Sequence, residues 1–239
     1  MEHALMELQF LLDFDGVLFN SNYEAYTVAQ KAAEGRPGFR QDVSFNEFET
    51  FRSVVTDAWH YNRLYNIARG TILPSMLREI EPEEDDWAFA SAFFAAREEI
   101  TKDPDWPKVM PPYDFFFLIR PLLIAYPHRF AILSTRNVAS IRQALAFHDA
   151  DVIRVFGQED IRRAGSKLAV AQEQNWLERG RWLIVYVDDM NSHLEPFEGM
   201  VHLPLHANWG YDHSDLSSLS HHQIFTIISS LLTLTEKQN

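Results

Sequence analysis

Leu11-Leu12-Asp13-Phe14-Asp15-Gly16-Val17-Leu18 ends the first apolar segment of this 239-residue chain and decides its fold. The apolar run 8–12 predicts a buried β-strand, because short apolar runs bounded by turn residues are typical of strands covered on both faces. Two carboxylates follow directly, and Gly16 permits a tight turn after them. Placing acids there without a use would be unfavourable. The pair Asp13 and Asp15 therefore indicates a ligand site.

The other apolar patterns alternate between strands and helices along the chain. Strands are expected at 130–133, 152–156, 183–187 and 200–203. Helices are expected at 114–125, 139–147 and 168–177. Such alternation, with continuous apolar strands, predicts an α/β protein whose parallel sheet is covered on both faces.

Residues 20–110 form a different kind of segment. They show helical periodicity and no convincing strand, and prolines 107, 111 and 112 mark their end. A stretch of this length is too long for an ordinary crossover connection. We therefore predict a helical domain at 20–110, inserted into an α/β core domain that consists of 1–19 and 111–239. The insert's acidic run 81–86 is interpreted as a solvated loop and a helix start.

Helix starts are indicated by three capping-box patterns, in which a Ser is followed three residues later by Glu or Gln. The patterns are Ser21…Glu24, Ser44…Glu47 and Ser220…Gln223. The last one predicts a C-terminal helix. His202 and His206 have a four-residue spacing, but Pro204 between them disfavours a helix, so both are expected in a loop.

The composition excludes several classes of protein. With 21 basic and 34 acidic residues the net charge is −13, which argues against broad binding to nucleic acid or an anionic membrane. The absence of cysteine excludes disulfides, zinc–thiolate sites and thiol nucleophiles. No signal-peptide pattern is visible, and the longest apolar run, 115–119, is far short of the ~20 residues of a membrane span. We expect a soluble, cytoplasmic protein.

A second pair of acids follows the predicted strand 183–187. Asp188 and Asp189 would lie at the same sheet edge as Asp13 and Asp15, because ligands bind at the carboxyl ends of parallel strands. Adjacent carboxylates repel each other, and a cation relieves that repulsion. Oxygen ligands suit Mg²⁺ in particular. The four acids therefore predict a magnesium site.

Polar residues that could bind an anionic substrate accompany these acids. Ser134, Thr135 and Arg136 follow the predicted strand 130–133. A hydroxyl there could donate to a phosphoryl oxygen, or it could cap the helix expected near residue 138. Lys167 lies 21 residues before Asp188 and could supply the cation that clustered carboxylates need.

In this order the motifs resemble those of the haloacid dehalogenase-like (HAD) hydrolase superfamily. The resemblance rests on Asp13-Phe14-Asp15-Gly16-Val17, Ser134-Thr135, Lys167 and Asp188-Asp189, with further agreement at Gly157-Gln158-Glu159-Asp160 and at the Trp209-Gly210-Tyr211 typical of phosphoglycolate phosphatase-like members. It implies a Rossmann-like core, with the insert as an all-helical cap of the C1 type. Three positions depart from the family's common residues without removing a catalytic group, namely Asn20, Arg136 and Leu168.

The resemblance also implies roles for the site residues. Asp13 would attack phosphorus to form an aspartyl-phosphate, and Asp15 would protonate the leaving oxygen and then deprotonate water. Ser134 and Lys167 would hold the transferring group, and Thr135 and Arg136 would join them in binding substrate.

The resemblance implies Mg²⁺ as the cofactor. Its expected ligands are Asp13, the Asp15 backbone carbonyl and Asp189, with Asp188 as a supporting acid. Asp15 favours phosphoryl chemistry over dehalogenation, because a halide leaving group needs no proton.

These roles predict a Mg²⁺-dependent phosphatase that hydrolyses a small phosphorylated metabolite. Two alternatives stay open, a phosphomutase and a catalytically quiet HAD-fold binding or regulatory module, although the intact motif acids weigh against the latter. The arginines and aromatic residues of the insert are interpreted as solvated face and cap core, so none is assigned to the site. The sequence determines neither the substrate nor the oligomeric state.

Overall fold

The computed structural model describes residues 7–52, 54–69, 76–77, 80–178, 180–212 and 217–236. The chain divides into two compact units. Met1–Asn20 and Pro111–Asn239 form the first, called here the core unit, and Ser21–Met110 form the second, called here the helical unit.

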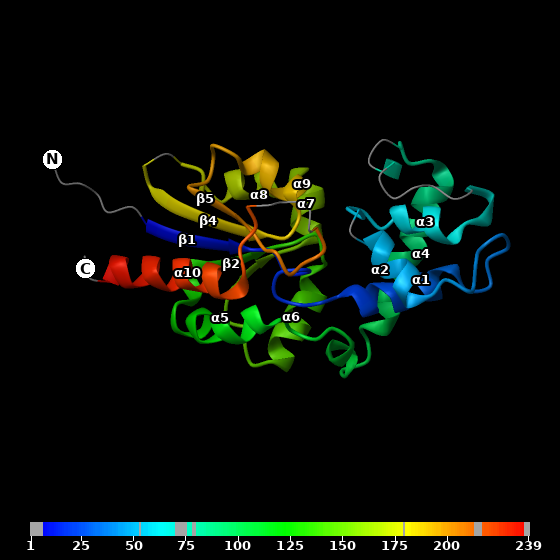
Figure 1. Cartoon of the computed structure of the whole chain (residues 1–239), viewed down its shortest axis with the longest axis horizontal. Coiled ribbons are helices and arrows are strands. Elements are labelled where there is room, and N and C mark those ends of the chain that lie inside the picture. The colour runs from blue at the N-terminus through cyan, green and yellow to red at the C-terminus, as the bar shows by residue number, and fades with distance from the viewer. Residues whose placement is uncertain are drawn as a thin grey trace. The chain divides into compact units, whose positions relative to one another are not determined.

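The core unit is built on a parallel sheet of five strands in the order β3-β2-β1-β4-β5 (Figure 1). The strands are β1 (Glu7–Leu12), β2 (Phe130–Leu133), β3 (Arg154–Phe156), β4 (Trp182–Asp188) and β5 (Leu203–His206). In the central register Leu12 pairs with Ile132 on one side and with Val187 on the other. The carboxyl ends of β1, β2 and β4 therefore meet at one edge of the sheet. This arrangement confirms the predicted α/β fold with a parallel sheet.

Two strands differ from their predicted bounds. β3 begins at Arg154, because residues 151–153 form a turn and a bend. β5 begins only where the predicted run 200–203 ends, since Met200 lies in a turn with its side chain half exposed. His206 consequently lies in β5 and is buried, so its placement in a loop was wrong.

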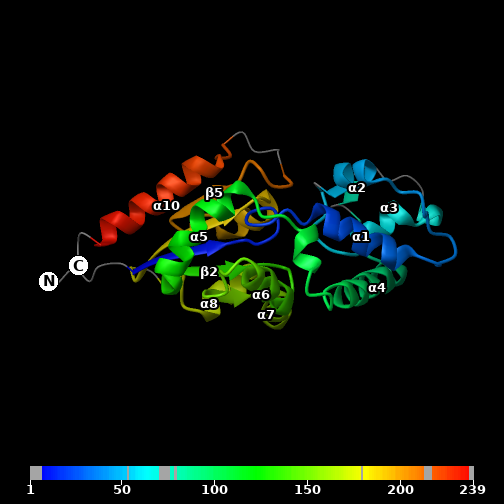
Figure 2. The ribbon, with the colours of Figure 1, turned by 90° about the horizontal axis from the view of Figure 1, so that it is seen from below.

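Helices cover both faces of this sheet. On one side lie α5 (Asp114–Ala125) and α10 (His221–Glu236), and on the other α8 (Lys167–Glu173) and α9 (Asn191–Leu194) (Figures 1 and 2). The unit also contains α6 (Val138–Phe147), α7 (Gln158–Ala164) and the short 3₁₀ helices Pro127–Arg129 and Glu195–Phe197. The 3₁₀ helix Trp106–Val109 belongs to the helical unit. The helix predicted at 114–125 is confirmed. Within the described residues, none of the helices combines the length and apolar character needed to cross a bilayer.

Alternation along the strands divides the core into two layers. Leu11 and Tyr186 pack with Val170 of α8 in one cluster. Phe10 points to the opposite face, where its ring stacks on Phe130 with centroids 4.9 Å apart. Over most of their length β1, β2 and β4 are thus buried on both faces, as their unbroken apolar runs indicate, whereas the edge strands β3 and β5 each expose a residue.

The helical unit contains α1 (Asn22–Ala33), α2 (Phe45–Arg52), α3 (His60–Tyr65), the 3₁₀ helix Ile67–Arg69 and α4 (Glu84–Ile100). Its described residues form no strand, only an isolated bridge between Phe39 and Asn66. Aromatic side chains dominate its core, and the Tyr61 ring lies between Phe48 and Phe93 with centroid separations of 4.9 and 5.3 Å.

The three predicted capping boxes have different outcomes. Ser44 Oγ accepts from the Glu47 N–H at 3.2 Å. At α10 the pattern is reciprocal, since the Ser220 N–H donates to Gln223 Oε1 at 2.9 Å and the Gln223 N–H to Ser220 Oγ at 3.4 Å. Ser21 is the N-cap of α1, but its side chain makes no capping hydrogen bond.

The acidic run 81–86, which extends into the first turn of α4, is not wholly solvated, contrary to the sequence interpretation. Asp86 is fully buried and forms an ion pair with Arg63, which is itself buried. Its other contacts are the Asn62 side-chain amide at 2.7 Å and the Glu83 N–H at 2.9 Å. In a helix, one residue of a charged run can face the interior while its neighbours face solvent. Here the inward-facing residue is Asp86, and Arg63 of α3 forms an ion pair with it. Arg63 is therefore a structural residue of the helical unit.

Asp86→Ala is expected to destabilise the protein strongly. Removing one partner of a buried ion pair leaves the buried Arg63 facing the exposed Glu83 carboxylate at 3.9 Å in place of Asp86, which costs about 3–5 kcal/mol. Urea-induced unfolding followed by circular dichroism would measure the loss. Glu84→Gln is the matched control, because Glu84 is exposed in the same helix turn and a surface change alters stability by only about 0.5 kcal/mol. Equal stability of the two variants would contradict the assignment.

Candidate active site

The loop after β1 holds Asp13 and Asp15 in fixed positions. The Asp13 N–H donates to the Val187 carbonyl at 2.9 Å, so the pairing with β4 continues one residue beyond β1. Asp13 Oδ1 accepts from the Phe14 N–H at 2.7 Å. Gly16 then adopts φ = +82°, a conformation that L side chains rarely take. The turn thus keeps the Asp13 carboxylate at the sheet edge, buried from solvent.

Lys167 joins the acids of β1 and β4. It is the first residue of α8, directly after Ser166, whose Oγ caps the helix by accepting from the Ala169 N–H at 3.0 Å. Its Nζ lies 3.0 Å from Asp13 Oδ2 and 2.8 Å from Asp188 Oδ2. The structure therefore brings together three of the residues that the sequence assigned to the site, as a buried ammonium between two buried carboxylates.

The charges of this cluster shift the pKa values of its members. Burial raises the pKa of the Asp13 carboxyl to about 6, despite the opposing effect of Lys167. For Asp188 burial acts in the same sense, but the charge and hydrogen bond of Lys167, with His193, outweigh it and hold the pKa below its usual range. Burial would lower the pKa of Lys167, yet the two carboxylates raise it. At neutral pH the ammonium therefore stays charged.

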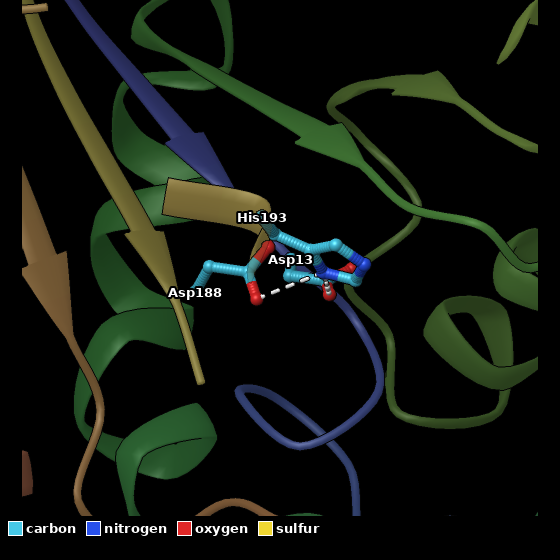
Figure 3. A group of neighbouring side chains, drawn as sticks. All are labelled: Asp13, Asp188 and His193. Carbon is cyan, nitrogen blue, oxygen red and sulfur yellow. Dashed lines mark hydrogen bonds and ion pairs between the residues drawn. The ribbon is translucent and has the colours of Figure 1, made fainter. Parts of the chain in front are cut away.

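Two residues of this cluster were missed in the sequence. The Tyr186 hydroxyl donates to Asp188 and lies 3.2 Å from Lys167 Nζ. His193 is on α9, and its Nδ1 lies 3.2 Å from both Lys167 Nζ and Asp188 Oδ1 and 3.9 Å from Asp13 Oδ2. Figure 3 shows the imidazole beside both carboxylates. One sequence feature could have identified His193. The histidine lies five residues after Asp188, on the segment that follows the carboxyl end of a buried strand.

Asp189 lies apart from this cluster, in a cradle made by two glycines. A Cβ at Gly16 would lie 2.2 Å from Asp189 Oδ2, and a Cβ at Gly210 would lie 2.3 Å from the same atom. The Tyr211 N–H donates to this oxygen at 2.6 Å, and the Trp209 Nε1–H donates to the Val17 carbonyl at 3.1 Å. The Trp209-Gly210-Tyr211 segment thus places the Asp189 carboxylate against the loop that carries Asp13 and Asp15.

Gly16→Ala is expected to destabilise the core unit more than its backbone strain alone explains. The left-handed conformation costs about 1–2 kcal/mol for an L residue, and the clash with Asp189 adds about 1–3 kcal/mol. Gly165→Ala is the matched control, since φ is +100° there and nothing lies within 4 Å of the added Cβ. Denaturant midpoints would measure both changes. A Gly16 variant no less stable than the Gly165 variant would contradict the close packing of the Asp189 carboxylate against Gly16.

The loop after β2 carries three of the four residues predicted to bind substrate, the fourth being Lys167, and it exposes them to different degrees. Ser134 is buried, Thr135 is exposed and Arg136 is buried. Ser134 continues the sheet, since its N–H donates to the Phe156 carbonyl at 3.0 Å. Asn137, not a hydroxyl residue, occupies the N-cap of α6. Arg136 reaches Asp15, with its Nη2 at 2.9 Å from Asp15 Oδ1.

Gly157-Gln158-Glu159-Asp160 fixes this loop from β3 and the start of α7. The Gln158 N–H donates to the Arg136 carbonyl at 2.8 Å, and Glu159 accepts from the Val138 N–H at 3.1 Å. The Gly157 N–H donates to Asp160 Oδ2 at 3.1 Å and so closes the turn at the start of α7. The segment therefore acts on the site by holding the loop after β2.

Comparison with known proteins identifies the fold. No model of a protein family matches the sequence, and a search of curated proteins found no significant match. Solved structures do match. A candidate phosphoglycolate phosphatase from Lactobacillus delbrueckii subsp. bulgaricus superposes with a TM-score of 0.65 at 13% identity, covering 94% of this chain and 99% of that one. A haloacid dehalogenase-like family hydrolase from Streptococcus pneumoniae gives 0.60 at 11% identity, covering 93% and 98%. The chain has the haloacid dehalogenase-like fold.

A third structure of this HAD-like fold contains a ligand. It is CbbY from Rhodobacter sphaeroides in complex with a xylulose bisphosphate, with a TM-score of 0.56 at 14% identity, covering 90% of this chain and 92% of that one. These alignments extend over nearly the whole chain, so the HAD-like match includes the helical unit as well as the sheet. At such low identity the likeness establishes the fold, and activity has to be argued from the site.

Proposed function

We propose that this chain is a Mg²⁺-dependent phosphatase that hydrolyses a small phosphorylated metabolite through an aspartyl-phosphate intermediate. The observation that carries the proposal is the buried Asp13 carboxylate, held 3.0 Å from Lys167 where β1 and β4 of a HAD-like sheet end. A carboxylate at such a position can act as a nucleophile toward phosphorus. The ammonium beside it can neutralise the charge of a transferring phosphoryl group.

The oxygen atoms near Asp13 fit a magnesium ion. The Asp189 carboxylate in its glycine cradle adjoins the loop that carries the Asp13 carboxylate and the Asp15 backbone carbonyl. A donor set of oxygens is the kind that Mg²⁺ prefers. Asp13, Asp188 and His193 also lie within metal-binding distance of one another, but Lys167 already contacts all three. We therefore assign Mg²⁺ to Asp13, the Asp15 carbonyl and Asp189, and Lys167 to Asp188.

When bound, Mg²⁺ supplies positive charge that reduces the repulsion between Asp13 and a phosphate dianion. The remaining work falls to the chain's own residues. In the first step an Asp13 oxygen forms a bond to phosphorus, the bond to the ester oxygen breaks, and Asp15 gives that oxygen a proton. In the second step Asp15 takes a proton from water, whose oxygen bonds to phosphorus while the bond between phosphorus and the Asp13 oxygen breaks, so that inorganic phosphate leaves and the Asp13 carboxylate is restored. Lys167 and Ser134 bind the phosphoryl oxygens throughout.

The helical unit is proposed to serve as the cap, with the domain boundaries that the sequence predicts, 20–110 for the cap and 1–19 with 111–239 for the core. A cap excludes water and adds contacts that distinguish one substrate from another. The substrate class is proposed to be small phosphate esters, the kind of ligand present in the CbbY structure.

Removal of the metal is the direct test of the proposal. Chelation with EDTA is expected to lower the rate of p-nitrophenyl phosphate hydrolysis by about 10²-fold or more. The reason is that the positive charge of the metal ion contributes several kcal/mol to the stabilisation of the transition state, and this contribution is lost. Added Mg²⁺ should restore the rate. The measurement is nitrophenol absorbance before and after each addition. Release that persists without metal would contradict the proposal, and dependence on a bisphosphorylated activator would indicate a phosphomutase.

A further inference from the structure

The guanidinium of Arg136 donates hydrogen bonds to both carboxylate oxygens of Asp15. Arg136 Nε lies 3.0 Å from Asp15 Oδ1 and 3.0 Å from Oδ2, and Nη2 lies 2.9 Å from Oδ1. The Arg136 side chain is 0% exposed and that of Asp15 only 15%. A planar guanidinium suits such a two-oxygen contact, which fixes the direction of a carboxylate as well as its place.

Arg136 is itself held by its own loop. Its carbonyl accepts from the Gln158 N–H at 2.8 Å, and its N–H donates to Ser134 Oγ at 3.4 Å. A Cβ at residue 157 would lie 2.6 Å from the Arg136 carbonyl oxygen, so a glycine there permits the close approach of the two backbones. The guanidinium carbon also lies 5.9 Å from the centre of the Phe14 ring. The loop thus fixes the backbone of Arg136, and the buried guanidinium lies between the Phe14 ring and the Asp15 carboxylate.

We infer that Arg136 is a positioning residue that fixes the direction of the Asp15 carboxylate and acts on the reaction through Asp15. The inference rests on the proposed function, in which Asp15 moves the proton. A carboxylate on a single methylene can rotate, and a misplacement of about 1 Å in a reacting group can lower a rate about 10²-fold. Three contacts of 2.9–3.0 Å from the buried Arg136 guanidinium prevent that rotation. The sequence had assigned Arg136 to substrate binding, where its effect would not depend on Asp15.

A double-mutant cycle on kcat/KM separates these two roles. Arg136→Gln is expected to lower kcat/KM about 10²-fold, mainly through kcat, and Asp15→Asn about 10³-fold. If Arg136 acts through Asp15, the double variant will match Asp15→Asn within about threefold, because the second change removes nothing further. Arg142→Gln is the matched control, since Arg142 is a partly exposed arginine of α6 paired with Asp151. Multiplied single effects, or an effect confined to KM, would overturn the inference.

Conservative substitution of Arg136, and rescue of a truncated variant by added guanidinium ion, give a second measurement of its role. Arg136→Lys keeps the charge but not the fork, so it is expected to stay within about threefold of Arg136→Gln. Guanidinium ion added to Arg136→Ala should recover activity, and it should recover none in Arg136→Ala combined with Asp15→Asn. Full activity of the lysine variant, or guanidinium recovery without Asp15, would overturn the inference.

The same four proteins of the cycle are also compared by thermal unfolding without substrate. A pair that exists in solution will show coupled rather than additive shifts in Tm, and additive shifts would overturn the inference without touching the proposed function. Failure of the proposed function has a different signature, namely that wild-type phosphate release does not depend on Asp13. In that case the positioning role of Arg136 would be rejected together with the proposed reaction. Coupled Tm shifts would still show that Arg136 and Asp15 are in contact.

Discussion

Asp13→Asn is expected to lower kcat for phosphate release by about 10⁴-fold or more, because an amide cannot form the acyl phosphate. The substitution preserves size, and Asn can still accept from the Phe14 N–H that now contacts Oδ1. The measurement is p-nitrophenyl phosphate hydrolysis at saturating Mg²⁺. Asp149→Asn is the matched control, since that side chain is 88% exposed in the core unit and should leave the rate unchanged.

The same variant should keep its stability in the metal-free protein. Burial raises the pKa of Asp13 from 3.8 to about 6, so the folded state disfavours the ionised carboxylate. A raised carboxyl pKa makes stability fall as pH increases through the interval between the two values. The neutral amide avoids that loss. The Tm of Asp13→Asn relative to wild type should therefore rise between about pH 4 and pH 7, and an inactive variant with a collapsed Tm would contradict a purely chemical role.

Lys167→Met is expected to damage both activity and stability. It removes the ammonium that lies 3.0 Å from Asp13 and 2.8 Å from Asp188, so both buried carboxylates lose that charge-compensating partner. The loss in the metal-free protein is about 3–5 kcal/mol of unfolding free energy, and activity should fall about 10³-fold. Denaturant unfolding and the hydrolysis assay measure the two effects. Lys102→Met is the matched control, because Lys102 is exposed and paired with Glu99 on the surface.

Removing one of the two carboxylates tests the cause of that loss. Combining Lys167→Met with Asp188→Asn eliminates one unpaired charge, so part of the stability should return while activity stays low. A Lys167 variant as stable as wild type, or one not improved by the second change, would show that the ammonium does not compensate these acids.

The sequence by itself determined the fold class, several strands and helices of the core, and the edge of the sheet where the acids gather. The apolar runs at 130–133 and 114–125 coincide with β2 and α5, because strand and helix periodicity are properties of neighbouring residues. Asp13 and Asp188 could be placed together from the sequence, since the carboxyl ends of parallel strands meet at one edge. Where periodicity was weak, as at β5, the predicted bounds shifted.

Only the tertiary structure decided which charges meet. The grip of Arg136 on Asp15 and the ion pair of Arg63 with Asp86 join residues far apart in the sequence. His193 beside Lys167 likewise depends on how α9 leaves the sheet. Such contacts are set by strand register, by the approach of loops and by the burial that makes an unpaired charge costly. No local pattern encodes these conditions. The sequence therefore indicated the acids and the lysine of the candidate site, but it did not indicate Tyr186, His193 or the contacts between the charged side chains.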